Sequence, residues 1–123
     1  MVKIILALSL LGMLSVGTAV AQSQSSVLPV LTGAYAPVTG GCNAAAAAFI
    51  YVEDKSIGAN KTAGKILSMK QSGGTYVLDV LWIEAGSEEA DGDRDTVQIE
   101  VKDDHSFFFS NTTSKKTLMQ WCS

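Results

Sequence analysis

The sequence predicts an all-β domain, and three observations support this prediction. Apolar and polar residues alternate over short segments, most clearly in residues 96–103. Glycine, proline, aspartate and asparagine separate these segments at short intervals. The part of the chain that follows the first 21 residues holds no long amphipathic helical repeat. A small antiparallel β-barrel of about seven or eight strands is the first prediction, because closure removes exposed sheet edges. A β-sandwich is the second.

The first 21 residues of the 123-residue chain have the pattern of an export signal. Lys3 supplies a positive start, residues 4–16 form an apolar run, and Ala-Val-Ala at 19–21 places small residues before a cut at Gln22. The alternative, a membrane anchor, requires a longer apolar run than this. We therefore expect a periplasmic or secreted protein with no membrane span once the signal is removed. Residues 22–26 are then a flexible N-terminus, and residues 27–123 form a single β domain.

The chain has two cysteines, Cys42 and Cys122. In an exported protein an even number of cysteines predicts a disulfide, and two cysteines allow one connectivity. This bridge would tie the exit of the first strand to the last strand. Free thiols or a pair of metal ligands are the alternatives. There is no C-x-x-C spacing and His105 is the only histidine, so zinc lacks a ligand set.

The first half of the domain has three predicted strands, over residues 27–35, 49–53 and 63–71. Pro29 places the start of the first strand at an edge, because proline donates no hydrogen bond to a neighbouring strand. A turn is predicted at 37–41, and a polar turn at 54–56 leads into a connection around Gly58. Five alanines at 44–48 favour at most one helical turn or a strand entry, since so short a helix is unstable alone.

The clearest strand covers residues 75–84 and follows a hairpin turn at Gly73-Gly74. Its two faces are both mostly apolar, so we expect a central strand whose outer face is partly covered. One face carries Tyr76, Leu78, Val80 and Trp82, and the other carries Val77, Asp79, Leu81 and Ile83.

Three further strands are predicted over residues 96–103, 105–110 and 115–122. The first of them has Val97, Ile99 and Val101 on one face and polar residues on the other. In the next, Phe107 and Phe109 point one way and Phe108 points the other. Phe108 is then either covered by a loop or part of an apolar patch that binds a partner.

Charge excludes nucleic acid as a partner. Without Lys3 the exported chain has eight basic and twelve acidic residues, a net charge of −4, which repels a phosphate backbone. Nine of the acids fall between residues 84 and 104, so we expect one strongly negative face or edge. It is either a solvated surface or a contact surface for a basic protein. The candidate partner-binding residues are Glu88, Glu89, Asp91, Asp93 and Phe108.

No motif predicts catalysis, and we expect neither an enzyme nor a cofactor. The run from Asp103 to Ser106 contains the residue types of a hydrolytic triad, but neighbours in a strand point to opposite faces. There is no G-x-S-x-G elbow. Weak calcium binding by Asp91, Asp93 and Asp95 is an alternative to a site with no metal. Thr96 and Lys102 stand where a calcium loop of the EF-hand type needs glycine and glutamate.

Leu31-Thr32-Gly33-Ala34-Tyr35 precedes the series of strands and resembles the start of calycin barrels, where lipocalins carry G-x-W. In size and in its single bridge the chain is closer to small periplasmic barrels that inhibit proteases or lysozyme. The resemblance implies a barrel and carries over no functional residue.

Together these observations predict a non-enzymatic exported protein that binds a protein partner. The candidate role is inhibition of a basic enzyme such as lysozyme or a protease. The alternatives are a carrier of a small apolar ligand, with Trp82 and Phe107 lining its cavity, and a structural envelope protein.

Overall fold

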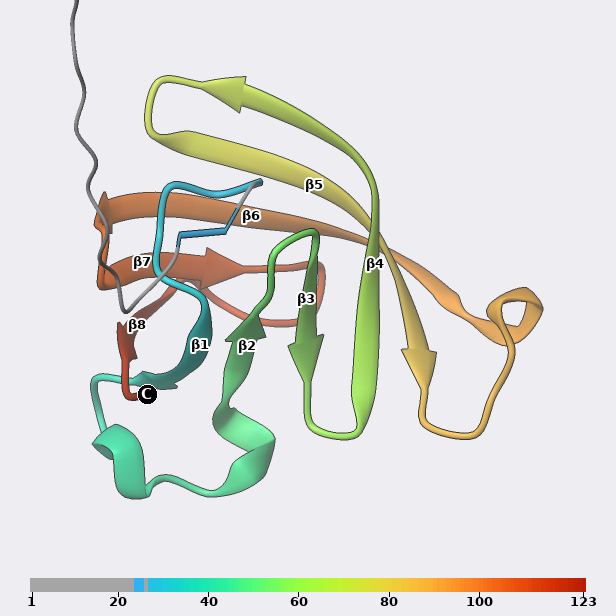
Figure 1. The fold of residues 1–123 in the computed structure, drawn as a ribbon, viewed down its shortest axis with the longest axis horizontal. Coiled ribbons are helices and arrows are strands. Elements are labelled where there is room, and N and C mark those ends of the chain that lie inside the picture. Colours follow the sequence, from blue (N-terminus) through green and yellow to red (C-terminus); the bar gives the residue numbers. More distant parts are fainter. Residues whose placement is uncertain (1–23, 26) are drawn as a thin grey trace, which may run out of the picture.

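The computed structural model describes residues 24, 25 and 27–123, and it confirms an all-β fold. Eight antiparallel strands follow one another around a closed barrel, each paired with its neighbours in the chain, and β8 pairs with β1 (Figure 1). The strands are β1 (Gly33–Pro37), β2 (Ile50–Val52), β3 (Ser56–Ala59), β4 (Thr62–Ser72), β5 (Thr75–Glu84), β6 (Asp93–Asp103), β7 (Ser106–Ser110) and β8 (Thr117–Trp121). Three short 3₁₀ turns join them: η1 (Gly41–Asn43), η2 (Ala46–Ala48) and η3 (Glu89–Asp91).

The predicted export signal lies outside the described residues. Within residues 24, 25 and 27–123, no helix has the length and apolar character needed to cross a membrane. The alanine run behaves as predicted, since η2 is a single helical turn.

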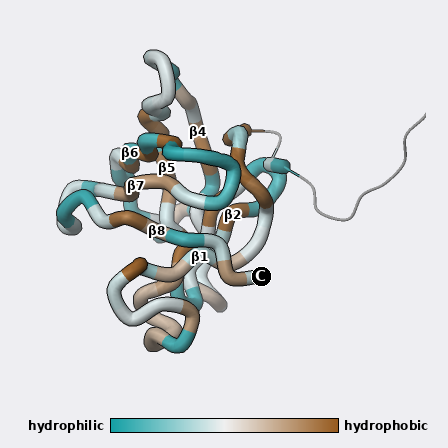
Figure 2. The backbone as a smooth tube through the Cα atoms, turned by 90° about the vertical axis from the view of Figure 1, so that its left-hand side faces the viewer, coloured by the Kyte–Doolittle hydropathy of each residue, from teal (hydrophilic) through white to brown (hydrophobic). Residues whose placement is uncertain are grey.

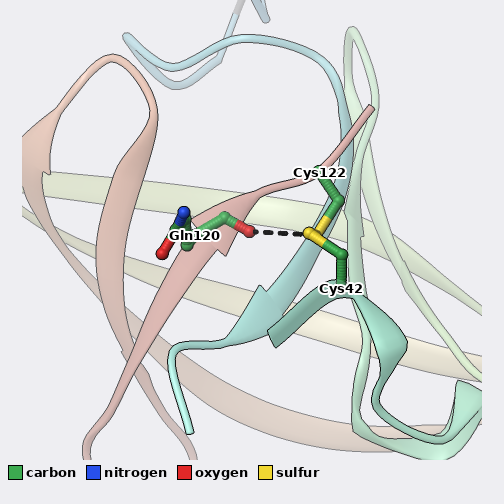
Figure 3. The surroundings of a disulfide bond; sticks show 3 residues. All are labelled: Cys42, Gln120 and Cys122. Carbon is green, nitrogen blue, oxygen red and sulfur yellow. Dashed lines mark hydrogen bonds between the residues drawn. A yellow bond between two sulfur atoms is a disulfide. The ribbon is translucent and has the colours of Figure 1, made fainter. Parts of the chain in front are cut away.

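The seam between the first and last strands closes the barrel. Tyr35 of β1 is opposite Ile50 of β2 on one side and opposite Trp121 of β8 on the other. The predicted disulfide is present beside this seam: Cys42 in η1 is bonded to Cys122, which directly follows β8 (Figure 3). The Cys122 N–H also donates a hydrogen bond to the Ala34 carbonyl at 2.7 Å. The bridge therefore reinforces strands that are already paired.

One apolar cluster fills the interior, as the alternation along the strands requires. Figure 2 shows hydrophobic and hydrophilic stretches alternating along the chain. Phe107 and Tyr35 are both fully buried, and their ring centroids lie 4.6 Å apart. The inward residues of β5 and β6 match the predicted faces: Tyr76, Leu78, Val80, Val97 and Ile99 are buried.

The segment before β1 is part of this core. The prediction of a strand over 27–35 is wrong for residues 27–32, because β1 begins only at Gly33. Leu28 and Val30 are nevertheless buried in the cluster, and the Tyr35 hydroxyl donates to the Leu31 carbonyl at 2.6 Å. Ser25, within the predicted flexible terminus, is also buried, and its hydroxyl donates to the Asp54 carbonyl at 3.1 Å.

Two further details differ from the sequence prediction or refine it. The connection predicted around Gly58 is strand β3, which pairs with β2 and β4. The outer face of β5 is partly covered, as predicted: Leu81 and Ile83 are half-buried, while Val77 is 37% exposed. Leu81 lies against Gly92, where an added Cβ would come within 2.9 Å of the leucine side chain.

Candidate functional site

The connection between β5 and β6 carries an exposed cluster of carboxylates, which we call the acidic loop. It comprises residues 84–93 and includes η3, and it projects from one end of the barrel (Figure 1). Its acidic residues are Glu84, Glu88, Glu89, Asp91 and Asp93, and all five are exposed. Four of the residues proposed from the sequence as partner-binding therefore lie together on one projecting element.

Contacts at three points hold the acidic loop. Lys65 of β4 forms an ion pair with Glu89, with 3.0 Å between Nζ and Oε1. Within the loop, the Gly92 N–H donates to the Glu89 carbonyl at 3.0 Å. Gly92 also packs so closely on β5 that an added Cβ would lie 3.0 Å from the Trp82 carbonyl oxygen. The loop thus presents its carboxylates from a backbone that is fixed to the barrel.

Most of these carboxylates have no ion-pair partner. Among the described residues, ion pairs join Lys65 to Glu89, Arg94 to Asp79, His105 to Asp104 and Lys116 to Glu100. Glu84, Glu88, Asp91 and Asp93 take part in none of them. Their charges are therefore available to a cationic partner. Because the four carboxylates repel one another, the approach of a positive charge that relieves this repulsion is favoured.

The nine acids between residues 84 and 104 are spread along β6 and the connections at its two ends. Strand β6 runs from Asp93 to Asp103, so the acidic loop is at its start and Asp103 and Asp104 are at its other end. At roughly 3.3 Å per residue, a strand of this length separates the two groups by about 33 Å. The acidic loop therefore groups five of the nine acids, away from Asp103 and Asp104.

Asp95 organises the side of the barrel next to the acidic loop. Its Oδ2 accepts hydrogen bonds from Trp82 Nε1 at 2.9 Å and from Asn111 Nδ2 at 3.1 Å, and its Oδ1 accepts one from the Thr112 hydroxyl at 2.9 Å. Burial acts to raise the pKa of Asp95, but the bonds from Trp82 and Thr112 outweigh it and hold the pKa below its ordinary value. Asp95 is therefore a structural carboxylate that joins β5, β6 and the turn after β7.

These hydrogen bonds engage both carboxylate oxygens of Asp95, so Asp95 does not join Asp91 and Asp93 as a calcium ligand. Among the described residues, the only group of three acidic, histidine or cysteine side chains with converging ligand atoms is Asp103, Asp104 and His105. Asp91, Asp93 and Asp95 do not converge in this way. The sequence did contain a signal for the role of Asp95. Residues 95, 97 and 99 alternate along the strand, so the Asp95 side chain lies on the same face as the buried Val97 and Ile99.

We expect Asp95→Asn to lower the free energy of unfolding at neutral pH by about 1–3 kcal/mol, because an amide accepts fewer of these hydrogen bonds. The folded-state pKa is lowered, so the stability that Asp95 contributes is present above its unfolded pKa of about 4 and lost as the pH falls through the folded pKa. Urea unfolding at pH values between about 7 and 2 measures both effects. Asp93→Asn, an exposed neighbour on the same strand, is the control and should change neither. Equal losses in the two variants would contradict a special role for Asp95.

The Asp103-Asp104-His105-Ser106 turn lacks the geometry of a hydrolytic triad. The Ser106 hydroxyl donates to Asp103 Oδ1 at 2.8 Å rather than to the imidazole. His105 Nδ1 lies 2.5 Å from Asp104 Oδ1, and the ring packs edge-on against Trp121 with 5.6 Å between centroids. The hydroxyl of Ser106 and the backbone N–H of His105 lower the pKa of Asp103. These contacts are those of a tight turn.

The remaining candidate residues lie apart from the acidic loop. Phe108 points outward, as predicted, and is half-buried, with the Lys116 ammonium 4.8 Å from its ring centroid. Phe107 is fully buried against Tyr35, whereas Trp82 is half-buried and hydrogen-bonded to Asp95. Lys65, which braces the acidic loop, was not proposed from the sequence because its contact with Glu89 depends on strand pairing.

The fold and these contacts define a small closed antiparallel barrel with one disulfide and one acidic projecting loop. Comparison of the chain with protein-family models, curated proteins and solved structures finds no match.

Proposed function

We propose that this protein is an exported, non-enzymatic binding protein that engages a basic protein through its acidic loop. The observation that carries the proposal is the grouping of Glu84, Glu88, Asp91 and Asp93, which are exposed and form no ion pair with another described residue. A loop held on a rigid scaffold loses little conformational entropy when it binds.

The electrostatics favour fast and specific capture of a cationic surface. Exposed charges concentrated on one element steer an oppositely charged partner during diffusion, and they contribute more to the association rate than to the lifetime of the complex. The effect extends over about one Debye length, which is roughly 8–10 Å at physiological salt. Binding by this loop should therefore depend strongly on ionic strength.

The class of partner that fits best is a basic enzyme outside the cytoplasm, such as a lysozyme or a protease. The disulfide supports an oxidising compartment, because such bridges rarely persist in the cytosol. The export signal predicted from the sequence has the same implication. An inhibitor that presents a projecting loop from a stapled barrel is the simplest function that uses these features together.

A c-type lysozyme is a suitable basic probe. We expect Glu88→Gln with Asp91→Asn to lower its association rate roughly tenfold at low salt, because two unpaired charges are removed from the projecting loop. Surface plasmon resonance at several salt concentrations measures this effect. Increasing salt should slow association of the wild type more than that of the double variant.

The matched control neutralises Glu53 and Asp104, which are exposed carboxylates outside the acidic loop. This Glu53→Gln, Asp104→Asn variant has the same net charge as the test variant, so it separates the position of the charges from their number. Equal association rates for the two double variants would contradict the proposal, as would binding that is insensitive to salt.

A further inference from the structure

A groove crosses the outer face of the barrel beside the base of the acidic loop. Strand pairing places four outward residues in one row across the sheet: Tyr51 of β2, Gly58 of β3, Ala63 of β4 and Ile83 of β5. The two middle residues are small, so they form a low floor between the side chains of Tyr51 and Ile83. The hollow has a volume of about 390 Å³, within the range of roughly 300–1,000 Å³ typical of ligand clefts. Figure 1 shows β2, β3, β4 and the last part of β5 side by side.

Gly58 leaves the middle of this groove open, although the fold does not require glycine there. Its backbone is outside the left-handed region. An added Cβ would make only ordinary contacts, 3.5 Å from the Thr62 carbonyl oxygen and 3.6 Å from the Tyr51 Cβ. Glycine inside a strand lowers stability, and it often marks a place where a ligand approaches the backbone. Gly58 therefore points to a ligand that lies over β3.

The charges around the groove favour a cationic ligand. Glu53 and Glu84 line the groove, as does Lys61, and none of the three forms an ion pair with another described residue. The Ser56 hydroxyl donates to Glu53 Oε1 at 2.7 Å and so orients this carboxylate. The acidic loop begins at Glu84, and its further carboxylates extend the negative field over the groove. A cation is attracted by this field, whereas a neutral ligand gains nothing from it.

The ring of Tyr51 supplies a surface on which a cation can stack. Tyr51 is 36% exposed, and its ring lies 6.1 Å from that of Phe49, centroid to centroid. Among the described residues, the one cation over an aromatic ring is Lys116, 4.8 Å from the centroid of Phe108, so the ring of Tyr51 has no such cover. A guanidinium is planar and more weakly hydrated than an ammonium, so it stacks better on an aromatic ring.

We propose that this groove binds an arginine side chain of the basic protein partner. The guanidinium stacks on the Tyr51 ring and pairs with Glu53, which lies two residues further along on the same face. The aliphatic part of the side chain lies over Gly58 and Ala63. The inference rests on the proposed function, because the arginine belongs to the partner that the acidic loop attracts. The acidic loop sets the association rate, and the short-range contacts in the groove lengthen the lifetime of the complex.

NMR titration of the isotope-labelled full chain, purified after secretory expression, with tetra-arginine tests the proposal. We expect the backbone amides of residues 51, 58 and 63 to shift together with those of the acidic loop. Tetra-lysine should shift mainly the acidic loop. Tyr51→Leu retains an apolar side chain without the aromatic ring, so it should weaken binding at the groove about two- to fivefold. Phe108→Leu removes an outward ring that Lys116 already covers, and as the control it should bind like the wild type.

Two further variants test the floor and the charge of the groove. Gly58→Val fills the floor with a residue that suits a strand, so the groove amides should no longer shift while those of the acidic loop still do. Lys61→Gln removes the positive charge from the rim, so it should tighten the binding of tetra-arginine. A saccharide would instead lose a hydrogen-bond donor in this variant and bind more weakly. A spectrum unchanged outside the groove shows that each variant is folded.

The results that contradict the proposal differ from those that contradict the proposed function. Shifts confined to the acidic loop exclude an arginine site in the groove and leave the proposed function of the loop intact, whereas the absence of any shift contradicts both. Groove shifts that are as large with tetra-lysine exclude a site selective for guanidinium. Chitotetraose that shifts the groove amides when tetra-arginine does not identifies a saccharide site and overturns the proposal.

Discussion

Replacing both cysteines, Cys42→Ala with Cys122→Ala, should lower the free energy of unfolding by about 4.5 kcal/mol while leaving the barrel folded. The bridge closes a loop of 80 residues in the unfolded chain, and the chain-entropy model gives this stabilisation at 25 °C. The barrel should persist because β1 and β8 remain paired through Tyr35, Ala36 and Pro37. The free energy of unfolding of a typical domain is roughly 5–15 kcal/mol in total, so this loss is a large fraction of it.

Urea unfolding followed by circular dichroism measures this loss, with the far-ultraviolet spectrum reporting that the strands survive. The wild type with its bridge reduced is the matched control, because it has the same loop entropy as the variant and retains both cysteine side chains. The two should agree in their unfolding midpoints. A loss below about 1 kcal/mol in both would contradict the entropic account, and it would mean that the unfolded chain is already held compact.

The sequence predicted the barrel and the bridge because both depend on signals that are local along the chain. Alternation in β5 and β6 identifies the inward residues directly, and a two-residue glycine turn identifies the hairpin between β4 and β5. Cys42 and Cys122 have only one possible pairing. The outward direction of Phe108 follows from the buried residues on either side of it.

Features that depend on tertiary pairing were not predictable in this way. The segment with Leu28 and Val30 has the apolar content of a strand, yet it packs across the core without joining the barrel. Gly33 is the residue at which this segment ends and β1 begins. Its φ is +136°, and an added Cβ would come 2.2 Å from the Ser123 carbonyl oxygen. Glycine is needed there because only it accepts this backbone geometry so close to the C-terminal residue.

The candidate site shows the same division. The sequence placed Glu88, Glu89, Asp91 and Asp93 in one loop, and the structure groups them there. The sequence did not show that the acidic loop lies far from Asp103, because the distance between them arises from the extended form of β6. It also could not show that Glu89 is paired with Lys65 of β4 while its neighbours are unpaired, since this follows from which strands lie side by side.

Phe107→Ala should lower the free energy of unfolding by about 3–5 kcal/mol, the range observed when a fully buried aromatic ring is removed from a close-packed core. Phe107 is 0% exposed, and its ring packs against Tyr35, which ties β1 to the segment before it through the Leu31 carbonyl. Urea unfolding at neutral pH measures the loss, and Phe108→Ala on the same strand is the control. Phe108 is half-buried and faces outward, so its removal should cost about 1 kcal/mol or less. The comparison also tests whether the barrel carries an apolar ligand. A ring that lines an open cavity has few neighbours to lose, so a small loss for Phe107→Ala would contradict a filled core and favour a carrier.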